Sequence, residues 1–324
     1  MKQPSIGILG GESLLGKEIR EVIRSRSMGA NLRLIGTDEE EVGKLVEEDG
    51  EPAIFTRLDR TSLLSSDVIV LAGSEASSRK AWEILASEKE PFLIDATGVL
   101  GDLPDIRVTA PLLGREELAS PCVIAHAAAA SLALLLKRLP DYRAAIAHVF
   151  EPASERGQAG IDELHQQTVR LFSFQALPKQ VFDAQLAFAL LARLGSEAPH
   201  SLDAIESRID RHLGILLGGQ RATPSLRLVQ APVFHGYSIS LWMEFSAPVN
   251  QADIERSLAC NHVELFGAEE EGPTNVSAAG RSGVAVGNLR ADRNHPHAYW
   301  MWLAMDNLRL TADNTVDAIE QVLR

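Results

Sequence analysis

The stretch Ile6–Gly16, with the sequence IGILGGESLLG, decides the fold. A short aliphatic run ends there in a glycine-rich turn, and an amphipathic segment follows as far as Ser25. A strand, a glycine turn and a helix in this order are typical of the start of a dinucleotide-binding βαβ unit. The stretch therefore predicts a Rossmann-like parallel sheet in the N-terminal part of the chain.

The same alternation of apolar runs and amphipathic segments continues to about residue 125. Continuous apolar strands separated by helices predict a parallel sheet covered on both faces, with right-handed crossovers. We expect Val68–Leu71 and Val123–Ala125 to be central strands. The other expected elements are strands at Ile6–Leu9, Leu32–Ile35, Asp67–Leu71 and Phe92–Asp95 and helices at Glu12–Ser25 and Glu75–Ser87.

From about residue 130 the pattern changes, because longer segments with partial alternation of apolar and polar residues replace the short runs. Such alternation predicts an antiparallel or mixed sheet, and hence a second part of α+β character. The expected strands are Ala144–Phe150, Leu226–Val229, Tyr237–Phe245, Val284–Leu289 and Ala298–Ala304, with a helix at Ser131–Leu139, two or three more up to Leu217, and a closing helix within Asp306–Arg324.

The composition limits the classes of partner and the compartment. The 324 residues carry a net charge of −13, which disfavours nucleic acid and anionic membrane surfaces. Two distant cysteines, Cys122 and Cys260, form no CxxC motif and fit a reducing compartment, so a cytoplasmic location is expected. The longest apolar stretch, Ala127–Leu136, is about half as long as a membrane span and predicts a buried helix.

The glycine turn is the candidate cofactor site. Ser13 stands where a middle glycine would let a pyrophosphate approach most closely, and Glu12 adds a negative charge there. Asp38 lies 22 residues after Gly16, about where a carboxylate holds an adenosine ribose, which favours NAD over NADP. Alternatively, the turn only packs the helix on the strand, and both interpretations stay open. The candidate cofactor-binding residues are Gly10, Gly11, Ser13, Gly16 and Asp38.

Several segments together resemble the aspartate-semialdehyde dehydrogenase family over nearly the whole chain, and most closely its Usg-type paralogues. Their order and spacing carry the resemblance. They are the glycine turn, the strand ending in Asp95, Val123–Ser131, Gly157–Leu164, Ala231–Ser238, Val286–Arg290 and Asp306–Arg309.

The resemblance implies an α/β fold with two domains. A Rossmann-like NAD(P)-binding domain would comprise residues 1–128 and 306–324, and an α+β dimerisation domain residues 129–305. A homodimer is the implied assembly. Members of the family reduce an acyl phosphate to an aldehyde: a cysteine thiolate at a helix N-terminus attacks the acyl carbon, a histidine moves the proton, arginines hold the substrate and NADP(H) exchanges the hydride.

This chain departs from the family at each of those catalytic positions. Ala129 stands in place of the cysteine, Gln230 in place of an arginine and Tyr237 in place of the histidine. The turn that holds the 2′-phosphate of NADP has become Thr37-Asp38-Glu39. Because such a catalytic set acts as a unit, we expect a protein that has lost the dehydrogenase chemistry. It would act by binding or assembly, including a heteromer with a catalytic relative.

Four side chains that could line a cleft fall in segments that correspond to the former active site: His126, Glu151, His235 and Tyr237. If they face one cleft, they could bind a ligand or move a proton without a covalent intermediate. An NAD-dependent oxidoreductase that works by direct hydride transfer is therefore the alternative. Glu163 is a further candidate for the cleft.

The sequence favours no metal site. His295-Pro296-His297 has a carboxylate nearby in Asp292, but the proline and the surrounding polar residues indicate a solvated loop. Cys122 in a buried strand and Cys260 beyond a helix are both interpreted as structural residues.

Overall fold

The computed structural model describes residues 3–37, 42–48, 51–103, 106–219, 221–267 and 269–324. The chain forms two compact units, residues 1–125 with 311–324 and residues 126–310. The units divide after Ala125 and Leu310, whereas the sequence placed the boundaries after residues 128 and 305. The first boundary falls earlier because His126 caps a helix of the second unit.

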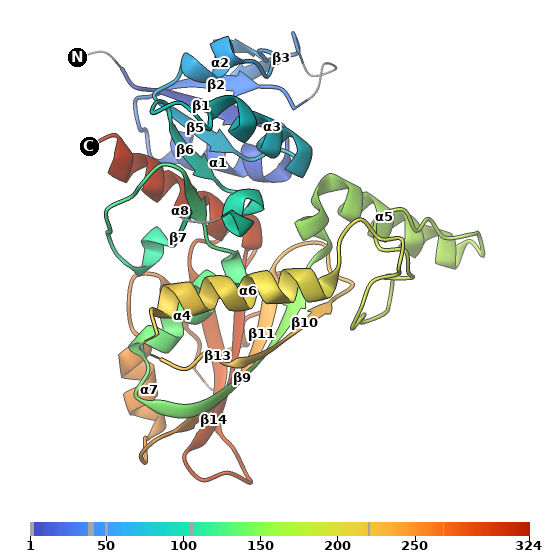
Figure 1. The fold of residues 1–324 in the computed structure, drawn as a ribbon. Helices are drawn as coiled ribbons and strands as arrows, with labels where there is room; N and C mark the ends of the chain where they lie inside the picture. Colours follow the sequence, from blue (N-terminus) through green and yellow to red (C-terminus); the bar gives the residue numbers. More distant parts are fainter. Residues whose placement is uncertain (1–2, 38–41, 49–50, 104–105, 220, 268) are drawn as a thin grey trace. The chain divides into compact units, whose positions relative to one another are not determined.

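The first unit is a six-stranded parallel sheet in the order β2-β1-β5-β6-β8-β7 (Figure 1). The predicted parallel sheet is therefore confirmed. The strand Val68–Leu71 lies inside the sheet, and the strand from Cys122 lies between β6 and the edge strand β7. The strands are β1 (Ser5–Leu9), β2 (Asn31–Ile35), β5 (Val68–Leu71), β6 (Phe92–Asp95), β7 (Arg107–Thr109) and β8 (Cys122–Ile124).

The helices of the first unit pack on the sheet through aliphatic side chains. Ile19 and Val22 of α1 and Val316 and Ile319 of α8 are buried in one core with the sheet residues. Arg26, just past α1, pairs with Asp313 and other acidic side chains of α8. The helices are α1 (Leu14–Ser25), α2 (Arg60–Leu64), α3 (Glu75–Leu85) and α8 (Asn307–Val322), and a hairpin of β3 (Leu45–Glu48) and β4 (Glu51–Ile54) was not predicted.

The second unit contains a six-stranded mixed sheet in the order β10-β9-β11-β14-β13-β12. The outer pairs β9–β10 and β12–β13 are parallel and the inner pairs are antiparallel, as the sequence predicted for a mixed sheet. The strands are β9 (Tyr142–Glu151), β10 (Ser225–Gln230), β11 (Tyr237–Phe245), β12 (Val263–Leu265), β13 (Val284–Ala291) and β14 (Ala298–Met305).

The two faces of this sheet differ in burial. Along β11, Tyr237 and every second residue after it are buried, and the residues between them are only partly buried. The helix α6 packs against β10 of this sheet and against α4 (Figure 1). The helices are α4 (Ala127–Arg138), α5 (Gly157–Phe172), α6 (Leu202–Leu217) and α7 (Gln251–Leu258).

Two predicted helices begin at other residues, and a cap explains each difference. The helix expected from Glu12 begins at Leu14, because the Ser13 hydroxyl accepts a hydrogen bond from the backbone N–H of Gly16. The helix expected from Ser131 begins at Ala127, because the His126 side chain accepts from the N–H of Ala128. No helix of the described residues is long and apolar enough to cross a membrane.

Candidate functional site

The glycine turn of the first unit is packed too closely for other residues at two positions. Gly10 has a φ of +81°, and a Cβ added to it would lie 2.4 Å from the Cα of Gly73. A Cβ on Gly16 would lie 2.1 Å from the carbonyl oxygen of Gly10. These contacts pack α1 against the ends of β1 and β5, which is one of the roles of glycine in a dinucleotide-binding turn.

The charge of Glu12 is compensated within the turn. Its carboxylate lies 2.8 Å from the buried Arg20 guanidinium and 3.1 Å from the Lys17 ammonium. Arg20 also donates to the carbonyl of Gly11 at 3.1 Å. The negative charge of Glu12 would repel a phosphate, and these two cations offset that repulsion.

The turn fits a dinucleotide in its glycine packing and in the helix that follows. Ser13 reduces the number of free donors, because its hydroxyl accepts from the N–H of Gly16 and donates to the carbonyl of Ala72 at 2.6 Å. Asp38, the predicted ribose ligand, lies outside the described residues. A bound nicotinamide dinucleotide would supply hydride transfer, and Gly10, Gly11 and Ser13 would line its pyrophosphate.

We predict that Ser13→Gly strengthens NADH binding about tenfold, because the freed N–H of Gly16 can then donate to a phosphate oxygen. Calorimetric titration of NADH measures this. Ser74→Gly is the matched control, because the Ser74 side chain caps α3 in the same way. Both substitutions should lower the free energy of unfolding by a similar few tenths of a kcal/mol. Equal affinities of Ser13→Gly and wild type would show that the cap does not limit binding.

In the second unit, the N-terminus of α4 presents no nucleophile. The side chains of Ala128 and Ala129 are fully buried in the first turn of the helix. A thioester intermediate needs a thiol, and a helix N-terminus favours its thiolate form. An alanine methyl group in this place can only pack.

Next to this turn, the Tyr237 hydroxyl joins two predicted site residues. It lies 3.2 Å from Nε2 of His126 and donates to Oε1 of Glu151, also at 3.2 Å. Tyr237 and Glu151 are fully buried, and the His126 side chain is 7% exposed. The structure therefore brings His126, Glu151 and Tyr237 together.

The hydrogen bonds of His126 fix which group donates and which accepts in the series His126–Tyr237–Glu151. The N–H of Ala128 donates to Nδ1 of His126, so the proton of the neutral imidazole is on Nε2. Nε2 then donates to the Tyr237 oxygen, and Tyr237 donates to Glu151. The other carboxylate oxygen of Glu151 accepts from Arg156 at 2.5 Å, so each member of the chain has a partner.

Burial sets the protonation states of these groups. It raises the pKa of Glu151 to about 7, with Arg156 opposing the shift and Glu155 adding to it. Burial, together with the nearby Arg208, His212 and Arg156, lowers the pKa of His126 well below its usual value. Burial raises the pKa of Tyr237 well above its usual value. At neutral pH the imidazole and the phenol are therefore uncharged, and Glu151 lies near its midpoint.

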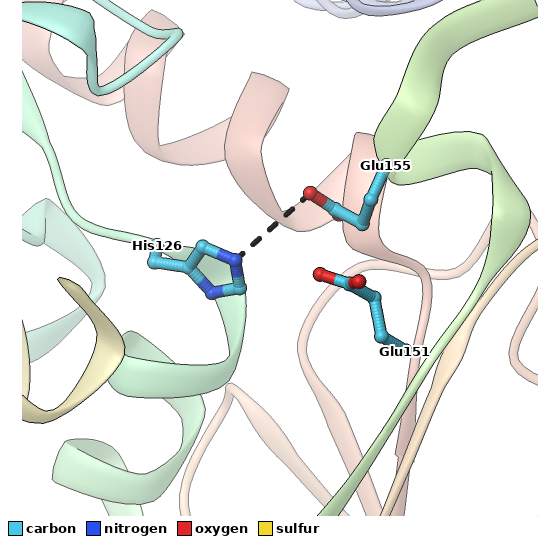
Figure 2. A group of neighbouring side chains, drawn as sticks. All are labelled: His126, Glu151 and Glu155. Carbon is cyan, nitrogen blue, oxygen red and sulfur yellow. Dashed lines mark ion pairs between the residues drawn. The ribbon is translucent and has the colours of Figure 1, made fainter. Parts of the chain in front are cut away.

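His126, Glu151 and Glu155 form the one group within the described residues whose donor atoms lie within 4.8 Å of one another, as a metal site requires (Figure 2). The donor set does not suit a divalent cation. Nε2 of His126 carries the proton, the Tyr237 hydroxyl contacts both His126 and Glu151, and Arg156 already neutralises Glu151. The geometry therefore favours a hydrogen-bonded network without a metal.

Gln230 does not act as a substrate clamp in this structure. Its side chain is fully buried, and its amide donates to the backbone carbonyl of Glu151 at 2.8 Å. A neutral amide used in this way holds β10 against β9 and cannot pair with an anion as an arginine does.

Two other candidates do not join the network. The backbone carbonyl of His235 accepts from Asn275, and no described contact links the His235 side chain to His126, Glu151 or Tyr237. Glu163 is buried elsewhere and accepts from the N–H groups of Val181 and Phe182. The expectation that Glu163 lines the cleft is therefore wrong, because its carboxylate holds the chain segment after α5.

Sequence reasoning missed Glu155, Arg156 and Asn307. Glu155 and Arg156 lie in the short 3-10 helix Ala153–Arg156 after β9, within reach of Glu151. Asn307 donates to Glu155 at 2.8 Å, and its side-chain oxygen accepts from the N–H of Gly236. The signal for Asn307 was its place in the Asp306–Arg309 motif, to which no role was given.

The cysteines offer no replacement nucleophile. Cys122 is fully buried in β8, and burial raises the pKa of its thiol to about 12, with Asp95 and Glu116 adding to the shift. Cys260 is partly buried between α7 and β12. His295 and His297 lie in an exposed turn, where Asp292 accepts hydrogen bonds from backbone and indole N–H groups.

Known proteins resemble this chain over its whole length. The family model described as "Semialdehyde dehydrogenase, dimerisation domain" matches residues 132–310. An aspartate-semialdehyde dehydrogenase of Rickettsia bellii is 27% identical over 100% of this chain and 98% of its own. A USG-1 protein homolog of Pseudomonas aeruginosa is 36% identical over 59% of this chain and 57% of its own. A solved structure of a probable aspartate-semialdehyde dehydrogenase from Pseudomonas aeruginosa matches with a TM-score of 0.87, 27% identity, and coverage of 100% and 99%.

Proposed function

The chain belongs to the semialdehyde dehydrogenase family, and from that premise we propose that it has lost the family's thioester chemistry and acts by binding or assembly. The observation that carries the proposal is Ala129, fully buried at the N-terminus of α4. Without a thiol there, no acyl group can be held on the protein while the hydride is exchanged. The relatives named aspartate-semialdehyde dehydrogenase carry the name of a reaction that this site lacks the nucleophile to perform.

The network around Tyr237 supports the same proposal. In the family the histidine and arginine act on substrate, whereas here Tyr237 and Gln230 are hydrogen-bonded to protein groups. The charge of Glu151 is balanced by Arg156. A substrate would have to displace these hydrogen bonds in order to bind.

A steady-state assay tests this proposal. We expect purified protein to give no phosphate-dependent reduction of NADP with aspartate semialdehyde above the rate without protein. A catalytic relative assayed under the same conditions serves as the positive control. Turnover by this chain that depends on phosphate would overturn the proposal.

We propose further that the glycine turn still binds a nicotinamide dinucleotide, NAD in preference to NADP, and that the protein is a cytoplasmic homodimer. The packing of Gly10 and Gly16 and the compensated charge of Glu12 support dinucleotide binding. Calorimetry with NADH and NADPH measures binding and preference directly. A heteromer with a catalytic relative is the other assembly that fits, and mixing the two purified proteins tests it.

The directed hydrogen-bond chain favours one second candidate, direct hydride transfer to a carbonyl group. Tyr237 could donate its proton to the developing alkoxide, and the protonated carboxyl of Glu151, whose pKa burial raises to about 7, could restore it. In a screen of aldehydes and ketones with NADH, Tyr237→Phe should then remove any activity of the wild type. A wild type without activity would eliminate this candidate.

A further inference from the structure

A buried arginine of α1 contacts the glycine turn of the first unit. The side chain of Arg20 is 9% exposed, and burying a guanidinium carries a large desolvation cost unless the group is paired and hydrogen-bonded. Its Nη1 donates to the carbonyl oxygen of Gly11 at 3.1 Å and to the Glu12 carboxylate at 2.8 Å. Arg20 therefore joins the helix to the turn through one backbone group and one side chain.

The hydrogen bond to Gly11 sets the direction of the next backbone N–H. The peptide bond between Gly11 and Glu12 is trans, and in a trans peptide the carbonyl of one residue and the N–H of the next point in opposite directions. Because the Gly11 carbonyl points toward the guanidinium of Arg20, the N–H of Glu12 points away from it. No group of the described residues accepts a hydrogen bond from this N–H.

The backbone N–H groups at the start of α1 are in the same state. Those of Leu14 and Leu15 have no acceptor in the part of the chain that the structure describes. The N–H of Ser13 differs, because it donates to the carbonyl of Gly10 at 3.0 Å. Donors of this kind, in a turn that leads into a helix, are the groups that hold a pyrophosphate. Among them, the N–H of Glu12 is the donor whose direction Arg20 sets.

Arg20 also provides the stronger of the two ion pairs of Glu12. The Lys17 ammonium is 3.1 Å from the same carboxylate, but the Lys17 side chain is 57% exposed, and an exposed ion pair contributes little. The guanidinium of Arg20 is shielded from solvent, so its attraction to Glu12 is screened less. Without Arg20, most of the negative charge of Glu12 would act on an anion bound at the turn.

We propose that Arg20 is a positioning residue of the glycine turn: it orients the N–H of Glu12 and neutralises the Glu12 carboxylate, so that the turn accepts the diphosphate of an adenosine nucleotide. This role rests on the dinucleotide binding proposed above, and Arg20 itself makes no contact with the ligand. It explains how a turn with an acidic side chain can hold a phosphate group. A donor that is already oriented loses less freedom when the ligand binds.

Calorimetric titration with NADH, ADP and adenosine tests this role in wild type, Arg20→Leu, Arg20→Lys and Glu12→Gln. Arg24→Leu is the matched control, because Arg24 lies on the same helix with its side chain 43% exposed, where it pairs with Glu21. Far-UV circular dichroism establishes that each variant is folded. Adenosine separates the two parts of the ligand, since it carries the base and the ribose without a phosphate.

We expect Arg20→Leu to weaken the binding of NADH and ADP at least about tenfold and to leave the affinity for adenosine unchanged. Arg24→Leu should bind all three ligands as wild type does. Arg20→Lys should lose less than Arg20→Leu, because it keeps the charge but not the planar fork. Glu12→Gln should bind NADH at least as tightly as wild type. Higher salt should reduce the ratio of the wild-type to the Arg20→Leu affinity, because it screens the repulsion by Glu12.

Two results would overturn the role of Arg20 and leave dinucleotide binding in place. One is an NADH affinity of folded Arg20→Leu equal to that of wild type. The other is a loss of adenosine affinity as large as the loss for ADP, which would indicate a general change in the fold. If Arg20→Leu does not fold, Arg20→Lys decides in the same way. A wild type that binds neither NADH nor ADP would overturn both the dinucleotide binding and this role.

Discussion

Replacing Arg156 by alanine should lower the free energy of unfolding by about 3–5 kcal/mol at pH 8, because it leaves the buried Glu151 carboxylate without its counter-charge. The two side chains are 5% and 0% exposed, and their charged atoms lie 2.5 Å apart. Arg79→Ala is the matched control. Arg79 pairs with Glu75 on the exposed surface of α3, where an ion pair contributes roughly 0–1 kcal/mol.

The loss in Arg156→Ala should be smaller at pH 5 than at pH 8. The pKa of Glu151 is raised from 4.5 to about 7 in the folded wild type, so its contribution to stability is greatest below pH 4.5 and is lost as the pH rises through 7. Without Arg156 the folded pKa rises further, and at pH 5 the carboxyl is protonated and needs no counter-charge. Urea unfolding at the two pH values measures both losses. Equal losses for Arg156→Ala and Arg79→Ala would contradict the structure of this network.

Restoring a cysteine alone should not restore turnover. We expect Ala129→Cys to remain at least about 10²–10⁴-fold below a catalytic relative, because the proton-shuttle position is still Tyr237 and the substrate clamp is still Gln230. The steady-state assay with aspartate semialdehyde and NADP measures the rate. The matched control is Ala133→Cys, a buried position one turn further along α4 and away from the helix N-terminus.

Turnover by Ala129→Cys near that of a catalytic relative would contradict this account of the site. It would mean that Tyr237 and Gln230 can serve as base and clamp, and that the cysteine was the sole missing group.

The order of elements was largely predictable from the sequence. Short apolar runs such as Val68–Leu71 between amphipathic segments are typical of buried parallel strands, and the alternation in Tyr237–Phe245 matches β11 residue for residue. The shift in the start of α4 came from a single side chain. The apolar pattern of Ala127–Leu136 indicated a buried helix, and nothing in that pattern identified His126 as its cap.

The candidate site residues were predictable where they fall in segments that resemble the family. The contacts that other side chains make in the folded protein were not predictable from the sequence. His126, Glu151 and Tyr237 were chosen from segments that resemble the family, and they do share hydrogen bonds. Arg156 was missed because an arginine after a strand carries no pattern that distinguishes a buried ion pair from a solvated one. Glu163 was predicted to line the cleft because its motif is retained. Its carboxylate instead accepts from a backbone N–H group of a later segment, a contact that the motif does not reveal.

The mass of the intact protein after incubation with aspartate semialdehyde and NADP, without phosphate, tests the central claim most directly. Under these conditions a family member with its cysteine forms a thioester that no phosphate releases. The absence of a thiol at Ala129 predicts an unchanged mass for this chain, with both Cys122 and Cys260 free. A gain equal to one aspartyl acyl group, abolished by Cys122→Ser or Cys260→Ser, would show that the chain has kept covalent chemistry at another thiol and would contradict the account.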